Sequence, residues 1–478
     1  MRIDNAETQM VPEEAWPRER EPQRRRVHLT PRAAETARPG LERMQSRLAG
    51  LRTRRITALV LLAIAIRVLV MPFTLHFDAY SIYSRAAEAA YGGQWFGFTS
   101  QFLIQGLHNV WLALMRPLLP DSANIWSPTA SVIGVGAGLD DYDRFMGYEH
   151  LYRVIFLMKV PYVIADLACA WVIAQLVPRR QQFAALALWL LNPLVIFSSA
   201  IWGRHDSVAI LLVLLSLLAA RRSTDAGRLV GLVLLGIATL SRFFPAVIVP
   251  LFLLAFRRNT RQLLAFVGLL GGMVALVELA AIATSGKSAI LTVLSSYQHV
   301  EYWFDAGVLL RLDDWMAIFP ILWLLGLFWL LERGMTVDEY PTFSAAAFLL
   351  VFAFTFFHPH YAVWLVPFLA IVIPASPVAG RLVAYHALQI ICVFAYSLQW
   401  GAWSSWELLR PLLGDRVASL PDPYEAISGQ IAPRVFFGSV RAGLTAASLW
   451  MLWLILPRPQ FVTRDIQAVA TVDAERQA

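Results

Sequence analysis

The chain has 478 residues, of which 58% are hydrophobic and 15% are charged. Soluble domains carry about 25% charged residues, so the composition excludes an ordinary soluble protein. Apolar stretches of about 20 residues recur along the chain and predict an all-α polytopic membrane protein. The net charge of +7 does not imply a nucleic-acid partner, because arginines in cytoplasmic loops account for it.

Polar segments at both ends of the chain frame the apolar part. Residues 1–55 are rich in Arg, Glu and Pro, which predicts a disordered, basic cytoplasmic tail. Residues 457–478 predict a second polar cytoplasmic tail. The transmembrane domain is therefore expected over residues 56–456, in the cell membrane and surrounded by membrane lipids.

The apolar stretches predict a bundle of roughly 11–13 transmembrane helices joined by loops and interfacial helices. They lie at about residues 56–75, 151–177, 183–201, 207–220, 228–240, 245–256, 263–284, 316–331, 342–357, 361–374, 381–399 and 434–456. Arginine-rich joints alternate with polar joints, and the arginine-rich ones are expected inside the cell. The polar joints, expected outside, are HFD (His76–Asp78), IWGRHDS (Ile201–Ser207), SRFF (Ser241–Phe244), Glu301–Asp314 and FHPHY (Phe357–Tyr361).

This alternation depends on two short stretches, residues 228–240 and 245–256. Each is too short to cross a hydrocarbon core of about 30 Å at 1.5 Å per residue. A single helix over both would invert the topology that follows. We favour a pair of helices broken at SRFFP, because Pro245 cannot donate a backbone N–H.

The first external loop, residues 76–150, is the longest. Within it, residues 79–92 have helical spacing, with Tyr80 and Tyr83 on one side, which predicts a helix lying in the membrane interface. Residues 102–120 predict a second interfacial or re-entrant element.

Ionisable residues at the ends of the apolar stretches are the functional candidates, because charge at membrane depth is costly. Asp78 is a candidate general base, against the alternative of a solvated loop residue. Arg204 and His205 are candidate phosphate donors. The alternative there is a helix cap built by Asp206.

Further polar residues leave alternatives open. Arg242, at the expected helix break, contacts either an anion or lipid headgroups. His358 and His360 suggest contact with a phosphate or sugar rather than a metal. The acidic run Asp140, Asp141 and Asp143 resembles a metal-binding element, with a solvated acidic turn as the commoner explanation. Arg67 and Asp166, inside apolar stretches, are expected to pair or to face a cavity.

Four stretches of the chain carry a resemblance to a known family. They are HFDAYSIYSRA, KVPYVIADLACA (Lys159–Ala170), NPLVIFSSAIWGRHDSV and SRFFPAVIVPLFLL. They resemble the integral-membrane glycosyltransferases of the GT-C superfamily, above all bacterial proteins related to the GPI mannosyltransferase II family. The resemblance implies a polyprenyl-phosphate sugar donor, a lipid-linked or glycan acceptor, a non-cytoplasmic active site and inversion at the anomeric carbon.

The resemblance also assigns roles to residues. The family's base falls on Asp78, and its WGQxD element falls on residues 202–206, where Arg204 replaces Gln. The expected donor and phosphate contacts are Arg204, His205, Asp206, Arg242, His358 and His360, and the expected substrate contacts are Trp202 and Tyr80. No metal ligand is assigned, although a divalent cation remains an open alternative. The competing hypothesis is a transporter or lipid flippase with a polar pathway.

Overall fold

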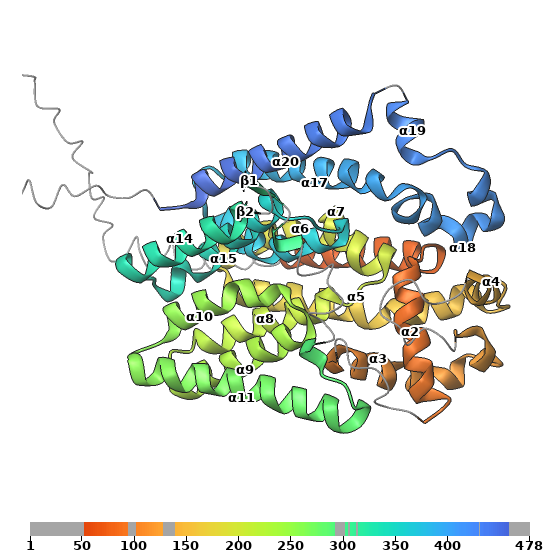
Figure 1. The fold of residues 1–478 in the computed structure, drawn as a ribbon, viewed down its shortest axis with the longest axis horizontal. Helices are drawn as coiled ribbons and strands as arrows, with labels where there is room; N and C mark the ends of the chain where they lie inside the picture. Colours follow the sequence, from red (N-terminus) through yellow and green to blue (C-terminus); the bar gives the residue numbers. More distant parts are fainter. Residues whose placement is uncertain are drawn as a thin grey trace, which may run out of the picture. The chain divides into compact units, whose positions relative to one another are not determined.

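A computed structural model describes residues 52–93, 102–127, 139–291, 302–304, 306–311, 314–429 and 431–457. The expected tails lie almost wholly outside these residues. Residues 56–478 form one unit, separate from residues 1–55. The described residues of this unit are helical, apart from two paired antiparallel strands, β1 (Gly307–Arg311) and β2 (Asp314–Ala317), where we expected only an external loop (Figure 1).

The helices succeed one another along the chain, and several of them are interrupted. The first helix is Arg52–Phe73. The others discussed below are α2 (Phe77–Ala90), α3 (Phe102–Met115), α4 (Leu139–Met146), α5 (Leu151–Leu176), α6 (Gln182–Leu190), α7 (Pro193–Ile196), the π-helix η5 (Phe197–Trp202), α8 (Asp206–Ala220), α9 (Asp225–Ser241), η6 (Phe244–Ile248), α10 (Val249–Phe256), α11 (Thr260–Ser285), α14 (Ile318–Arg333), α15 (Tyr340–Phe354), η9 (Pro359–Leu365), α16 (Val366–Val372), α17 (Ala379–Ser397), α18 (Arg410–Leu413), α19 (Pro423–Ser428) and α20 (Pro433–Ile455).

Several helices are long and apolar enough to cross a membrane, which confirms the all-α polytopic prediction. Within the described ranges there are six such helices, or seven if a pair bent by 47° counts as one span. The pair is Arg179–Leu190 with Pro193–Trp202, and the side chain of Asn192 caps the second part. Shorter apolar helices occupy other expected spans, namely Asp206–Ala220, Phe244–Phe256 and Pro359–Ala375.

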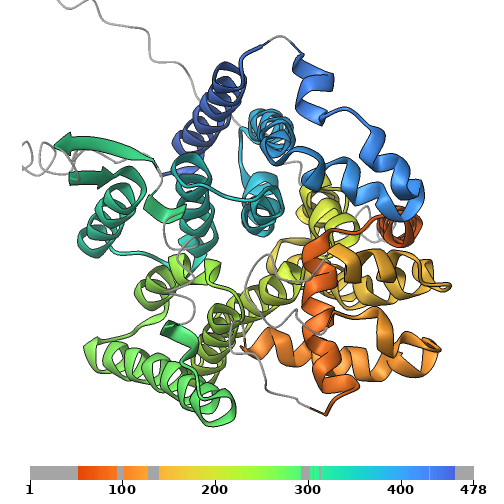
Figure 2. The same ribbon diagram turned by 45° about the vertical axis from the view of Figure 1, so that its right-hand side comes forward.

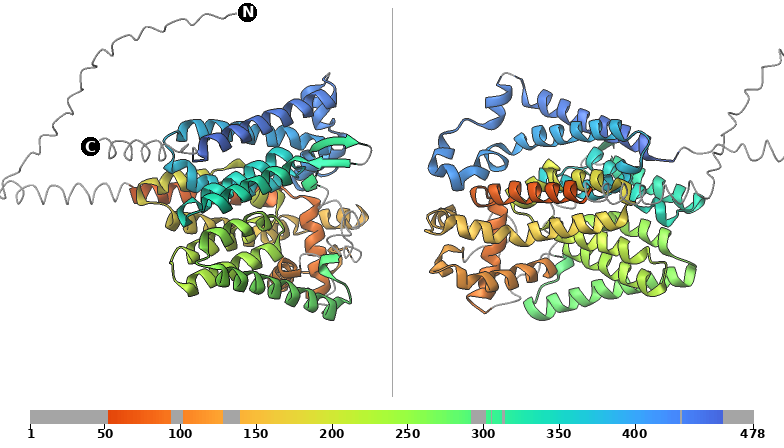
Figure 3. Two further views of the ribbon diagram at one scale, coloured as in Figure 1. Left: turned by 60° about the vertical axis from the view of Figure 1, so that its left-hand side comes forward. Right: turned by 180° about the vertical axis from the view of Figure 1, so that it is seen from behind.

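The spans lie roughly alongside one another, and α2 crosses them. α17 packs on α20, and both lie at the opposite edge of the unit from α11 (Figures 1 and 2). α2 runs across the direction of these helices in every view (Figures 1 and 3). α2 is not among the candidate membrane spans found in the described residues.

The expected break at SRFFP is confirmed. α9 ends at Ser241, Arg242 is extended, and the chain resumes as η6 and α10. Arg258, just after α10, donates to the carboxylate of Asp225 at 3.1 Å, at the start of α9. The two helices therefore lead out to the break and back to the same end of the bundle.

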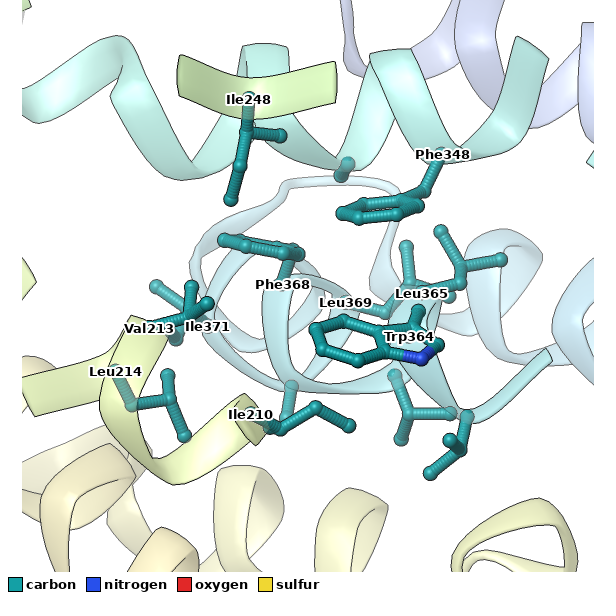
Figure 4. Packing of buried hydrophobic residues seen from close by; sticks show 14 of the residues in the cluster. Ile210, Val213, Leu214, Ile248, Phe348, Trp364, Leu365, Phe368, Leu369 and Ile371 are labelled. Carbon is teal, nitrogen blue, oxygen red and sulfur yellow. The ribbon is translucent and has the colours of Figure 1, made fainter. Parts of the chain in front are cut away.

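The core around α16 is filled by large apolar side chains from separate helices. Figure 4 shows Trp364 and Phe368 packed between Ile210 of α8 and Phe348 of α15. This packing fixes the helix that carries Trp364, whose indole reaches the polar cluster described below.

A buried ion pair ties the first helix to α5. The guanidinium of Arg67 donates to the carboxylate of Asp166 at 3.0 Å, and both side chains are fully buried. The hydroxyls of Ser199 and Ser207 donate to the same carboxylate. Of the two alternatives that the sequence left open for Arg67 and Asp166, the structure shows pairing.

We predict that Arg67→Met destabilises the protein by about 3–5 kcal/mol, because it leaves a buried carboxylate without its cation. The double variant Arg67→Met/Asp166→Leu should lose less than the single variant, because no buried charge remains. Reversible unfolding in mixed micelles, followed by tryptophan fluorescence, measures both. Equal losses for the single and double variants would contradict the assignment.

Candidate functional site

Two chain segments meet at one end of the bundle. The exit segment, residues 71–79, leaves the first helix and enters α2. His76 is the N-cap residue of α2, and its Nδ1 accepts from the backbone N–H of Asp78 at 3.0 Å. The imidazole of His76 stacks on Trp202, with ring centroids 3.8 Å apart, so the exit segment lies against the second segment.

The second segment, the π turn, comprises residues 197–204. The backbone N–H groups of Gly203 and Arg204 both donate to the Ser198 carbonyl, at 3.1 and 2.9 Å. Gly203 has a φ of +83°, a conformation that glycine adopts without steric cost. π-helical turns occur often at functional sites, and this one directs Arg204 towards the exit segment.

Asp78 and Arg204 face each other across the two segments. Nη1 of Arg204 lies 3.4 Å from Oδ2 of Asp78; the guanidinium is 8% exposed and the carboxylate 42%. Burial alone would raise the pKa of Asp78, but the nearby His76, Arg204 and His360 outweigh it and hold this pKa well below its ordinary value of 3.8. The carboxylate is thus ionised and open on one side.

Asp206 and Arg242 form a second, fully enclosed pair. The guanidinium of Arg242 donates to both carboxylate oxygens of Asp206, at 2.9 and 3.2 Å. The indole of Trp364 donates to the same carboxylate at 2.8 Å, and Tyr361 lies under the guanidinium at 5.2 Å. The pair therefore joins the start of α8, the break after α9 and η9.

Two buried histidines stand beside these pairs with unused hydrogen-bonding capacity. Among the described residues, neither ring nitrogen of His205 nor of His360 has a hydrogen-bond partner, and the same holds for Nε1 of Trp202. His360 packs on Trp202 at 4.8 Å between ring centroids, and His358 lies 5.9 Å from His360. These groups can donate to or accept from a polar ligand.

The remaining expected site residues lie in other surroundings. Tyr80 is fully buried, and its hydroxyl donates to the Ile125 carbonyl at 3.1 Å, which is a packing contact. Asp141 accepts from Ser127 at 2.7 Å, and Asp143 pairs with Arg410 at 2.6 Å. Within the described ranges, no three His, Cys, Asp or Glu side chains could hold a metal ion together.

Sequence reasoning missed one residue that the structure brings to the site. Lys159 of α5 is completely buried, and its ammonium lies among backbone carbonyls of both the exit segment and the π turn. A lysine inside an apolar span was the available signal, since the chain has only one other lysine, Lys287.

We predict that Arg242→Met destabilises the protein by about 3–5 kcal/mol, because the carboxylate of Asp206 is left buried without its cation. Arg258→Met is the matched control: its pair with Asp225 is solvent-exposed, so it should cost below about 1 kcal/mol. Unfolding in mixed micelles compares the two, and similar losses would refute a buried pair.

Comparison with known proteins gives one match. Residues 105–258 match the family model described as alpha-(1->6)-mannopyranosyltransferase, N-terminal domain. The match supports glycosyltransferase activity and does not confirm the likeness to the GPI mannosyltransferase II family. No curated protein and no solved structure matches the chain. The matched region contains the π turn, Asp206 and Arg242. Over residues 105–258 the chain is therefore similar to a mannosyltransferase domain.

Proposed function

We propose that the protein is an inverting mannosyltransferase of the GT-C type. It moves mannose from a polyprenyl-phosphate donor to a lipid-linked or glycan acceptor on the non-cytoplasmic face of the membrane. The match over residues 105–258 supports mannose as the sugar. The observation that carries the proposal is the ionised carboxylate of Asp78, partly exposed and 3.4 Å from the buried guanidinium of Arg204.

The chemistry requires a base and an anion-binding group on opposite sides of the anomeric carbon, so the donor sugar has to enter between Asp78 and Arg204. The acceptor hydroxyl attacks the anomeric carbon of the donor and gives its proton to the carboxylate of Asp78. The bond from that carbon to the phosphate oxygen breaks, and its electron pair leaves with the lipid phosphate. Attack opposite the leaving group inverts the anomeric centre.

The leaving phosphate needs positive charge and hydrogen-bond donors. Arg204 supplies the charge, and the unpartnered nitrogens of His205, His360 and Trp202 supply donors. His358 lies beside His360 as a further contact. Arg242 and Asp206 bind each other, so their part is to hold the start of α8, and with it His205, in place.

The distribution of arginines supports a non-cytoplasmic site. Arg258 and Asp225 mark the end of the α9–α10 pair opposite to Arg242. Further arginines cluster there in sequence, among them Arg221, Arg222 and Arg257. Arginine-rich ends are typical of the cytoplasmic side, which supports the proposed location of Asp78 and Arg204 at the non-cytoplasmic end.

Asp78→Asn is expected to lower kcat at least about 100-fold, the lower bound for a lost general base. The variant keeps the side-chain shape, so the KM for the donor should change little. Transfer is measured in proteoliposomes with polyprenyl-phosphate mannose and a lipid-linked glycan acceptor.

Glu88→Gln is the matched control, since it removes another carboxylate from α2 and should leave transfer unchanged. Full activity of Asp78→Asn would refute the base. A wild-type protein that transfers from no polyprenyl-phosphate sugar would refute the function and favour the transporter hypothesis.

The pH dependence gives a second test of the same pair. Because the pKa of Asp78 lies well below 3.8, the acid limb of kcat/KM in the wild type should lie below that pH. Arg204→Gln removes a cation that stabilises the ionised carboxylate, while His76 and His360 still face it. The pKa of Asp78 should then rise, and the acid limb should move to higher pH.

Arg144→Gln, in the first external loop, is the control for loss of an arginine and should keep the wild-type profile. The relative rate at each pH gives the position of the limb even if Arg204→Gln is slow. An acid limb at the same pH in both variants would contradict the coupling.

A further inference from the structure

One buried ammonium contacts both segments of the candidate site. Nζ of Lys159 lies 3.0 Å from the Met71 carbonyl and 3.0 Å from Oγ1 of Thr74, and it also contacts the Thr74 carbonyl. On the other side it lies 2.9 Å from the Ala200 carbonyl and 3.0 Å from the Ile201 carbonyl. Five oxygens thus share three N–H donors.

The ammonium is neutralised by no carboxylate among the described residues. The ion pairs found there do not include Lys159. Burying an unpaired charge is costly, and the carbonyl dipoles offset that cost only while they stay close together around Nζ. The charge therefore resists any movement that separates the exit segment from the π turn.

Both segments lead directly from this ammonium to the facing pair. Asp78 follows Thr74 by four residues, and Arg204 follows Ile201 by three. Direct hydrogen bonds between the segments are few and long: the Thr74 hydroxyl donates to the Ala200 carbonyl at 3.4 Å, and the His76 N–H donates to the Trp202 carbonyl at 3.4 Å. Lys159 supplies most of the remaining polar contact between them.

The aliphatic part of the Lys159 side chain also packs against the π turn at Gly203. A Cβ at Gly203 would lie 3.2 Å from Cε of Lys159 and 3.3 Å from Cβ of Ala79. Because Gly203 has no side chain, α5, the exit segment and the π turn can all come into contact at this point.

We propose that Lys159 is a positioning residue that sets the separation between the carboxylate of Asp78 and the guanidinium of Arg204. The proposal rests on the proposed function, in which these two groups act on the acceptor and the donor. Lys159 itself touches neither substrate. A misplacement of about 1 Å can lower a rate by about 100-fold, so the geometry held by Lys159 should appear in kcat.

The test compares Lys159→Met with Phe256→Ala in proteoliposomes. Methionine has a similar length but no N–H donor or charge. Phe256 is buried at the end of α10, where its ring packs on Phe252 and Tyr340, so its loss destabilises the protein without removing a contact to either segment. We expect Lys159→Met to lower kcat by about 100-fold while the donor KM stays close to that of the wild type. Phe256→Ala should keep the wild-type kcat, although it loses as much thermal stability as Lys159→Met or more.

A retained kcat in Lys159→Met, or an equal loss of kcat in both variants, would overturn the proposal. If Lys159→Met does not fold, Gly203→Ala takes its place, because the added methyl group presses on the lysine stem and on Ala79. A fall in kcat without a change in donor KM is then the supporting result, and an unchanged kcat overturns the proposal.

Hydrogen–deuterium exchange separates this proposal from the proposed function. Loss of the ammonium should speed exchange in residues 71–79 and 197–204 together, and Phe256→Ala should not. If the wild type transfers no sugar, the function fails, and faster exchange in both segments still supports positioning by Lys159. Unchanged exchange in both segments overturns it.

Discussion

Charge that is buried between apolar helices has to be met by protein atoms, because an apolar interior does not hydrate it. In this protein each buried carboxylate has its partner on another element of the fold. Asp166 of α5 meets Arg67 of the first helix, and Asp206 of α8 meets Arg242 after α9. These requirements decide which helices come together, and the polar cluster at the start of α8 and the end of α9 follows from them.

The cluster separates two kinds of charged group. The Asp206–Arg242 pair is enclosed and saturated by Trp364 and Tyr361, so it stabilises the arrangement of helices. The Asp78–Arg204 pair is longer, at 3.4 Å, and one side of the carboxylate is exposed. A pair that is loosely bound and accessible can exchange its partner for a substrate, and this difference is why the Asp78–Arg204 pair carries the proposed chemistry.

Much of the architecture was predictable from local sequence. Pro245 marked the break between α9 and α10, and the cost of charge within spans indicated that Arg67 and Asp166 either pair or face a cavity. Partner choice was not predictable, because hydropathy and spacing do not say which side chains face each other. Arg242 was therefore expected to bind phosphate, whereas it binds Asp206, 36 residues earlier. The pairing of β1 with β2 was missed for a similar reason, since it depends on contacts between the two strands.

The π-helix at Phe197–Trp202 makes the register of this region depend on a single residue. A π-helical turn accommodates one residue more than an α-helical turn. Removing one residue from it would restore α-helical geometry and rotate the preceding helix relative to Gly203 by about 100°, the angle that each residue subtends in a helix of 3.6 residues per turn. Asn192 and Trp189 would then leave their partners on α17 and α5. Sequences that share this site should therefore keep the length of the turn unchanged.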